Sequence, residues 1–149
     1  MREPAGRCLI DTNVLIYATL SDDARHLTAL RVLEWARQGS IEAVVSVQNL
    51  AEMFPNLTGP KRKPPDAPEL ARRKIESIAR LRYLSVLPIT PATVLQTLAL
   101  CAAHGIRQQD YFDAQLAATM LEHEVPTVIT EDPGVFSKFA KVHTYNPFR

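Results

Sequence analysis

At 149 residues and 46% hydrophobic, the chain has the usual size of one domain and can bury a sizeable core without metals or disulfides. Its formal net charge of +1 neither requires nor excludes a polyanionic partner, so any nucleic-acid signal must come from local charge. No stretch approaches the roughly 20 apolar residues that cross a bilayer, and the N-terminus lacks the apolar region of a signal peptide. The two cysteines, Cys8 and Cys101, lie in apolar runs and suit reduced, buried thiols. We therefore expect one cytoplasmic domain over residues 1–149, without a membrane anchor.

The chain begins with a predicted strand, loop and helix. Cys8 to Ile10 is a short apolar run, and Asp11 directly after it is suited to cap a helical turn over Val14 to Tyr17. Apolar residues from Leu27 to Ala36 then recur at helical spacing, and Gly39 supplies a stop. These signals predict a strand followed by two helices.

A second strand-then-helix unit follows. Glu42 to Val47 is short and rich in β-branched residues, and the apolar residues from Leu50 to Leu57 fit one helical face. Gly59 to Pro68 is dense in proline and basic charge, which predicts an exposed loop. A helix is expected over Glu69 to Leu84, and a strand over Ser85 to Leu87.

The last third of the chain continues the alternation. Pro91 fits the first turn of a helix that runs to His104 and ends at Gly105. The remaining predicted elements are a helix over Ala114 to Leu121, a strand over Thr127 to Ile129, a short helix near Val135 to Phe139 and an edge strand over Val142 to Tyr145. Short apolar strands that alternate with helices indicate an α/β fold, a three-layer α/β/α sandwich around a central parallel sheet.

Acidic residues follow the predicted strands. Asp11 comes directly after the first strand, Asp132 closely after the strand Thr127 to Ile129, and Glu52 one to two turns into a helix after the second strand. Asp110 and Asp113 open the helix Ala114 to Leu121. Because ligands of open parallel sheets bind outside the carboxyl ends of the strands, these carboxylates could converge at one edge.

Converging carboxylates would repel one another and could not all stay ionised without a compensating cation. Mg²⁺ suits such a site because it prefers hard oxygen ligands and takes a few carboxylates plus substrate phosphate. A metal held there would promote hydrolysis of a phosphodiester. Thr12 and Thr130 lie beside the acids, where a hydroxyl could orient a water or a carboxylate.

Each acid also has an ordinary structural interpretation. Asp11 alone could be only a helix cap, Glu52 a solvated helix residue and Asp132, before a proline, a turn residue. Asp110 could cap a helix on which Asp113 is the ligand, or replace Asp113 in that role. Only the set as a whole favours a metal site.

Four short segments, in order along nearly the whole chain, resemble the PIN-domain family and, within it, the VapC-type toxins. They are Leu9-Ile10-Asp11-Thr12-Asn13-Val14-Leu15, Ser46-Val47-Gln48-Asn49-Leu50-Ala51-Glu52, Phe112-Asp113-Ala114-Gln115-Leu116-Ala117-Ala118-Thr119 and Thr130-Glu131-Asp132-Pro133. The resemblance implies an α/β/α fold, Mg²⁺ or Mn²⁺ dependence, cleavage of single-stranded or structured RNA, homodimers and inhibition by a small cognate antitoxin. It also implies that Asp11, Glu52, Asp113 and Asp132 form the acidic cluster, with Thr130 as a hydroxyl neighbour.

The loop Gly59 to Pro68 departs from this resemblance because it is more basic and richer in proline than the family pattern, and Asp110 is an additional acid. The segment from Lys61 to Arg82 contains eight basic residues and three acidic ones. That stretch could bind phosphates, or it could be a solvated helix face beside a loop.

Two other functions remain open at the level of the sequence. Asp11 could be the nucleophile of a phosphatase, although Asn13 stands where such enzymes usually carry a second aspartate. The domain could also bind RNA without cleaving it, although its acid set is complete.

Overall fold

A computed structural model describes residues 3–149, and within them a single five-stranded sheet lies between two layers of helices. All strands pair in parallel, in the order β3-β2-β1-β4-β5. Their bounds are β1 Gly6–Ile10, β2 Ile41–Ser46, β3 Leu84–Leu87, β4 Thr127–Ile129 and β5 His143–Tyr145. The helices are α1 Thr12–Tyr17, α2 His26–Gln38, α3 Val47–Thr58, α4 Pro68–Ala79, α5 Pro91–His104 and α6 Asp110–Glu122, with a short 3-10 helix η1 at Gly134–Lys138. The predicted three-layer α/β/α fold is confirmed.

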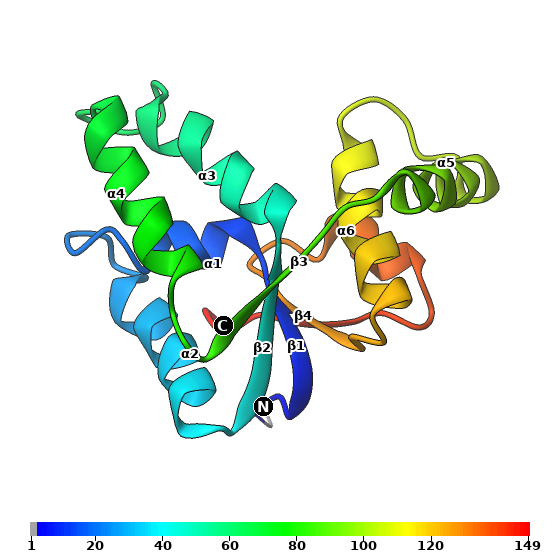
Figure 1. The fold of residues 1–149 in the computed structure, drawn as a ribbon, viewed down its shortest axis with the longest axis horizontal. Helices are drawn as coiled ribbons and strands as arrows, with labels where there is room; N and C mark the ends of the chain where they lie inside the picture. Colours follow the sequence, from blue (N-terminus) through cyan, green and yellow to red (C-terminus); the bar gives the residue numbers. More distant parts are fainter. Residues whose placement is uncertain (1–2) are drawn as a thin grey trace.

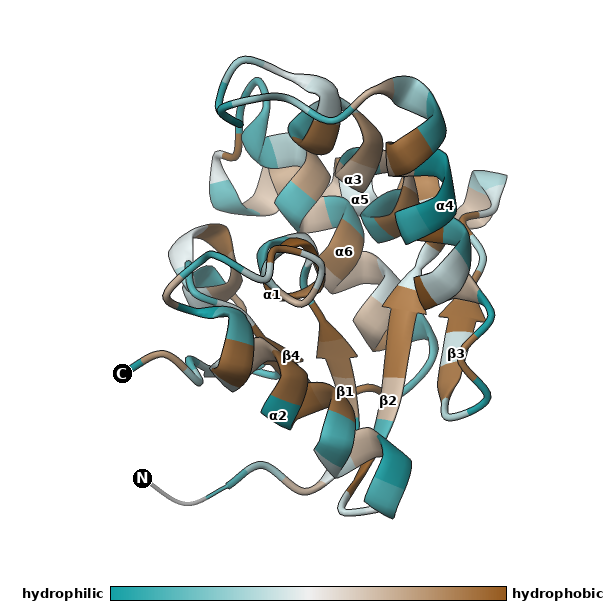
Figure 2. Cartoon of the chain, turned by 90° about the vertical axis from the view of Figure 1, so that its left-hand side faces the viewer, coloured by the Kyte–Doolittle hydropathy of each residue, from teal (hydrophilic) through white to brown (hydrophobic). Residues whose placement is uncertain are grey.

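Successive residues of the central strands face opposite layers of helices, as the two-residue period of a strand requires. Cys8 and Ile10 of β1 belong to a core with α1 to α4, whereas Leu9 packs into a second core with α6 and η1. Figure 1 shows α1 to α4 on one side of the sheet and α5 and α6 on the other. In Figure 2 the central strands are hydrophobic along most of their length, as expected of a sheet covered on both faces.

Several predicted boundaries are confirmed and others are wrong. Gly39 and Gly105 end α2 and α5 in the left-handed conformation, with φ of 80° and 64°. The helix expected over Glu69 to Leu84 ends instead at Ala79, because Leu84 pairs with Ala43 as the first residue of β3. The apolar spacing continues past the helix end, but sheet pairing overrides it.

The sheet order places a topological switch point at β1. The chain leaves β1 toward β2 and β3 on one side, whereas β4 and β5 lie on the other. Ligands of open α/β sheets bind outside the carboxyl ends of the strands at such a point. Asp11 follows β1 there, and Thr130 follows β4. No helix within residues 3–149 has the length and apolar character needed to span a bilayer.

Because β1 lies at the centre of the sheet, truncation of one of its buried side chains should leave a cavity and lower the free energy of unfolding considerably. Leu9 is fully buried, so we expect Leu9→Ala to lower the free energy of unfolding by about 2–5 kcal/mol. Leu95 on α5 is 68% exposed, so Leu95→Ala should change this free energy by less than about 0.5 kcal/mol. Urea unfolding followed by circular dichroism measures both, and equal effects of the two substitutions would contradict the assignment of the core.

Candidate active site

A pocket of about 330 Å³ lies at the carboxyl ends of the central strands and collects the predicted acids. Four elements or their flanking turns supply its carboxylates, since Asp11 follows β1, Glu52 lies on α3, Asp113 on α6 and Asp132 beyond β4. The full lining is Asp11, Thr12, Asn13, Ile16, Tyr17, Glu52, Asn56, Lys61, Arg62, Asp113 and Asp132. The convergence expected from the sequence is therefore present.

Asp11 is the most buried acid of the pocket, with 8% of its surface exposed. Its Oδ1 accepts a hydrogen bond from the Thr12 backbone N at 2.8 Å, so it caps α1 as predicted, while its Oδ2 accepts from the Thr130 hydroxyl at 2.8 Å. The pKa of Asp11 is raised from 3.8 to about 6, mainly by burial, although both hydrogen bonds act in the opposite direction. The charges of Glu52 and Asp132 contribute to the rise, after burial. Capping and membership of the acid cluster thus coexist in one side chain.

Glu52 is held by side chains from two different elements. Its Oε2 accepts a hydrogen bond from the Thr12 hydroxyl at 3.0 Å, and its Oε1 accepts one from the Gln48 amide one helical turn earlier. The Gln48 carbonyl in turn accepts from the Gln115 amide at 2.7 Å, which ties α3 to α6. Since these donors fix both oxygens, Glu52 is oriented in the pocket wall and is not a freely solvated helix residue.

Asp113, and not Asp110, lines the pocket from α6. The pKa of Asp113 is raised to about 7, mainly by burial and then by the charges of Asp11, Glu52 and Asp132, with a last, smallest contribution from Asp110. Asp110 is the exposed first residue of the helix. The interpretation of Asp110 as the helix cap is wrong, because Gln109 occupies the cap position in a helical backbone conformation and makes no side-chain cap bond.

The turn after β4 brings the last acid to the rim. Asp132 is exposed, and its backbone N donates to the Thr130 hydroxyl oxygen at 3.0 Å. Thr130 therefore links this turn to Asp11. Asn13 adds a second link, since its amide nitrogen lies 3.3 Å from the Thr130 hydroxyl and its carbonyl accepts from the Glu131 backbone N at 3.3 Å.

The spacing of the acids decides which kind of metal site would fit. Among residues 3–149, no three His, Cys, Asp or Glu side chains are gathered tightly enough to hold one ion by themselves. Mg²⁺ commonly keeps several waters and takes only one or two carboxylates plus substrate phosphates. Each carboxylate also has lone pairs beyond those its hydrogen bonds use. The pocket therefore fits a hydrated divalent cation better than a closed structural site such as that of zinc.

The sequence did not single out the residues behind the acids. Asn49 is fully buried, donates to the Thr12 hydroxyl at 3.0 Å and approaches Asp11 Oδ1 at 3.5 Å. Gln48 and Gln115 are also buried, and all three lie inside the segments quoted for the resemblance. The sequence did contain a signal for them, since each is a polar amide within an otherwise apolar run. A buried amide usually has a specific hydrogen-bond partner.

Comparison with known proteins identifies the family of the chain and agrees with its fold. The family model described as "PIN domain" matches residues 8–142, so the chain belongs to the PIN-domain family. A relative named Ribonuclease VapC24, from Mycobacterium tuberculosis, is 29% identical over 140 residues, which cover 93% of this chain and 94% of that protein. The family resemblance noted in the sequence is thereby confirmed.

Solved structures of similar fold include VapC20 of Mycobacterium tuberculosis, described as a sarcin-ricin loop cleaving toxin. It has a TM-score of 0.68 and 21% identity, and the match covers 91% of this chain and 98% of that one. VapBC-1 of nontypeable Haemophilus influenzae has a TM-score of 0.66 at 18% identity, and the match covers 96% and 99% of the two chains. At these identities the likeness concerns the fold.

The raised pKa values of Asp11 and Asp113 predict how stability depends on pH without divalent cations. Both exceed the ordinary value of 3.8, so these groups favour the folded state below about pH 4 and lose that contribution as the pH rises through 6 and 7. At pH 8 and in the presence of a chelator, Asp113→Asn should therefore be more stable than the wild type and should unfold at a higher urea concentration. We expect its free energy of unfolding to be higher by on the order of 1–2 kcal/mol, after allowance for solvent screening. Unfolding at several pH values measures this difference.

The exposed neighbour supplies the control for that experiment. Asp110→Asn removes a carboxylate from the same helix end but not from the pocket. The charge of Asp110 is the last and smallest of the causes that raise the pKa of Asp113, so this variant should stay close to the pH dependence of the wild type. An Asp113→Asn protein with the same pH profile as the wild type would contradict the electrostatic account.

Proposed function

We propose that this protein is a divalent-metal-dependent endoribonuclease that acts as the toxin of a toxin–antitoxin pair. The observation that carries the proposal is the single pocket lined by Asp11, Glu52, Asp113 and Asp132 at the switch point of the sheet. A nearly full-length relative named as a ribonuclease, and a similar fold in a toxin described as cleaving the sarcin-ricin loop, support RNA as the substrate.

In this proposal the four carboxylates hold one or more divalent cations, Mg²⁺ or alternatively Mn²⁺. When bound, such a cation supplies charge that stabilises the attacking and leaving oxygens of phosphodiester hydrolysis. Thr12 and Thr130 keep Glu52 and Asp11 in place through their hydroxyl groups. A bound cation would also favour the ionised form of Asp113, whose pKa is about 7 without the cation.

The partners follow from the same proposal. We infer a homodimer and a small antitoxin protein, in the cytoplasm where RNA and antitoxin meet. Large exposed apolar side chains on α5 and α6 support protein contacts, namely Leu95, Leu98 and Phe112 at 68%, 51% and 44% exposure. The free thiols of Cys8 and Cys101 are in keeping with a reducing compartment.

The geometry favours a metal-holding role for Asp11 over a nucleophilic one. A nucleophilic carboxylate must let the phosphorus of the substrate approach one of its oxygens closely, and the nearly complete burial of Asp11 leaves little space for that approach. Asn13, at the position of the usual second aspartate of such phosphatases, is committed to the turn after β4.

The proposal predicts that Asp11→Asn abolishes metal-dependent RNA cleavage while the protein still folds. Asn keeps the shape and can still accept from Thr12, but it removes the buried charge. We expect cleavage to fall by more than about 100-fold, beyond the effect typical of residues that only support metal ligands. Labelled structured and single-stranded RNAs incubated with Mg²⁺, Mn²⁺ or chelator measure this loss.

A matched pair on α6 sharpens the assay. Asp113→Asn should also lose cleavage, whereas Asp110→Asn, which changes an exposed acid one turn away, should retain it. Undiminished cleavage by a folded Asp11→Asn protein would sink the proposed site. Metal-dependent RNA binding without any cleavage by the wild type would favour the non-catalytic alternative.

A further inference from the structure

The loop between α3 and α4 adds positive charge to a pocket that otherwise collects acids. Lys61 and Arg62 line the pocket of Asp11, Glu52 and Asp113. The same two residues also line a second pocket of about 380 Å³, which continues past them. Its lining is Thr19, Leu20, Ser21, Asp22, Asp23, Lys61, Arg62, Lys63, Pro64, Asp66 and Lys74. Lys61 and Arg62 therefore form a wall shared by two adjoining pockets.

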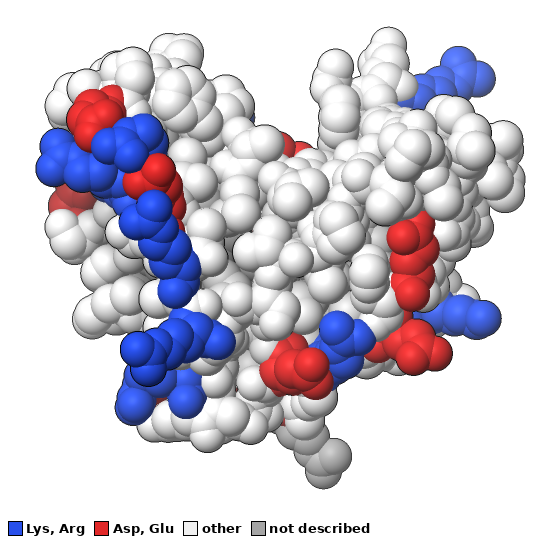
Figure 3. All heavy atoms as spheres, in the orientation of Figure 1, with Lys and Arg blue, Asp and Glu red and all other residues white. Residues whose placement is uncertain are grey.

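The charges of this wall differ from those of the neighbouring helix. On α4, Arg72 pairs with Glu69 and Glu76, and Arg73 with Glu69. Figure 3 shows blue Lys and Arg atoms beside red Asp and Glu atoms at the upper left of the molecule, where α4 lies in Figure 1. Within residues 3–149, by contrast, Lys61, Arg62 and Lys63 form no ion pair.

Arg62 also carries an unsatisfied donor. Its Nε is buried and has no hydrogen-bond partner among the described residues. The nearby Asp23 is already paired with Arg25 at 3.0 Å. A buried donor without a partner is costly in a folded protein, so an acceptor supplied by a ligand such as a phosphate would lower this cost.

The loop is held in place by specific contacts at both ends. The Arg62 backbone N donates to the Gly59 carbonyl at 3.2 Å, and the Asp66 backbone N donates to the Leu57 carbonyl at 2.8 Å. Asp66 also pairs with Lys74 at 2.7 Å, where both side chains are mostly buried. At Gly59 an added Cβ would lie 2.6 Å from the Pro55 carbonyl oxygen, so the close approach of loop and helix requires glycine there.

We propose that Lys61 and Arg62 bind phosphates of the RNA strand beside the cleaved bond, guiding the strand from the acid pocket into the second pocket. This inference rests on the proposed function for the identity of the ligand as RNA. The planar guanidinium of Arg62 can hold a phosphate through two parallel hydrogen bonds, and Lys61 adds a point charge. A strand held by this wall places its backbone against the carboxylates instead of being repelled by them.

The test is RNA binding by the Arg62→Ala protein. Fluorescence anisotropy with a labelled single-stranded RNA oligonucleotide, in Mg²⁺ and at several KCl concentrations, gives affinity and its salt dependence. To prevent cleavage, all proteins carry Asp11→Asn. We expect about tenfold weaker binding, as for removal of a charged hydrogen bond. The slope of log Kd against log salt should fall by about 0.7 for each phosphate that the protein no longer neutralises.

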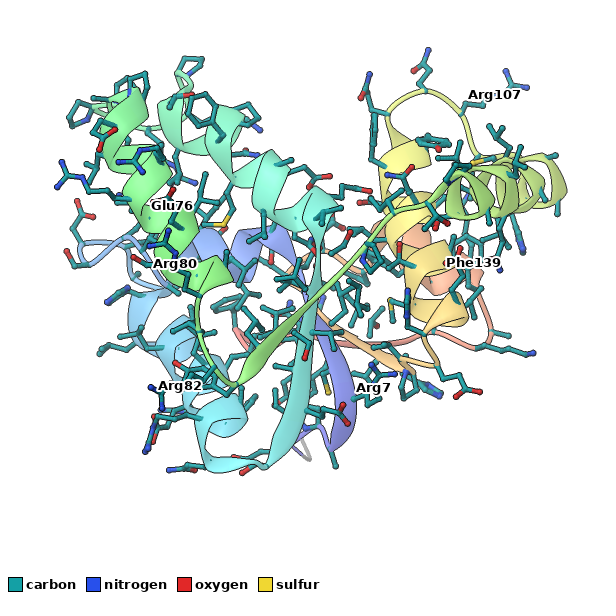
Figure 4. The ribbon with its side chains drawn as sticks, viewed as in Figure 1. Arg7, Glu76, Arg80, Arg82, Arg107 and Phe139 are labelled. Carbon is teal, nitrogen blue, oxygen red and sulfur yellow. The ribbon has the colours of Figure 1, made fainter. Side chains whose placement is uncertain are left out.

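Matched variants separate this role from general charge and from folding. Arg82→Ala removes an exposed arginine that lines neither pocket; in Figure 4 Arg82 lies below α4. The RNA affinity and salt slope of this variant should therefore match those of the protein that carries Asp11→Asn alone. Arg62→Lys should recover part of the affinity, because it keeps the charge but loses the planar donor pair. Should Arg62→Ala fail to fold, Lys61→Ala gives the same test.

The outcomes distinguish this inference from the proposed function. Unchanged affinity and salt slope in folded Arg62→Ala and Lys61→Ala proteins would overturn the inference and leave the wall to another ligand, such as an acidic peptide, even if the wild type cleaves RNA. Weaker binding with a smaller slope would support it. If the protein with native Asp11 then cleaved no RNA, the phosphate-binding wall would stand while the nuclease proposal failed.

Discussion

The placement of Asp11 is the constraint on which the rest of the site depends. Parallel strands end at a common edge, so residues that follow β1 and β4 must lie close together there. Asp11 sits at this edge almost without solvent, and burial raises its pKa to about 6. The carboxylates of Glu52, Asp113 and Asp132 line the same pocket. Repulsion between these charges is unfavourable for folding and favourable for cation binding, so the same arrangement destabilises the protein alone and prepares it for a ligand.

Polar side chains behind the acids keep this unfavourable arrangement rigid. The hydroxyls of Thr12 and Thr130 donate to Glu52 and Asp11, and the buried amide of Asn49 donates to Thr12. These partners lie 37 to 119 residues apart in the chain, so the completed fold is needed to assemble them. From the α3–α4 loop, Lys61 and Arg62 line the same pocket, and neither forms an ion pair within residues 3–149. The pocket thus presents negative charge from the sheet edge and positive charge from one loop, which suits a cation and a phosphate chain together.

The sequence predicted what local patterns control. Asp11 after a short apolar run predicted both a strand end and a helix cap, and the alternation of elements predicted the parallel sheet. Prediction from the sequence failed where tertiary contacts determine the structure. The apolar spacing through Leu84 predicted too long a helix, because pairing with β2 recruits that residue into β3. The cap assigned to Asp110 was wrong because Gln109 already has helical backbone angles. The choice of Asp113 over Asp110 as the pocket acid needed the direction of each side chain, which spacing alone does not give.

Direct measurement of cation binding tests the central claim, that the converging carboxylates form one divalent-metal site. Mn²⁺ can be titrated into the metal-free protein at pH 7.5, with the free ion followed by electron paramagnetic resonance. The account predicts saturable binding by the wild type and by Asp110→Asn, and binding weakened by more than about tenfold in Asp11→Asn and Asp113→Asn. Equal Mn²⁺ binding by all four folded proteins would contradict it, since the cation would then be held somewhere other than the pocket.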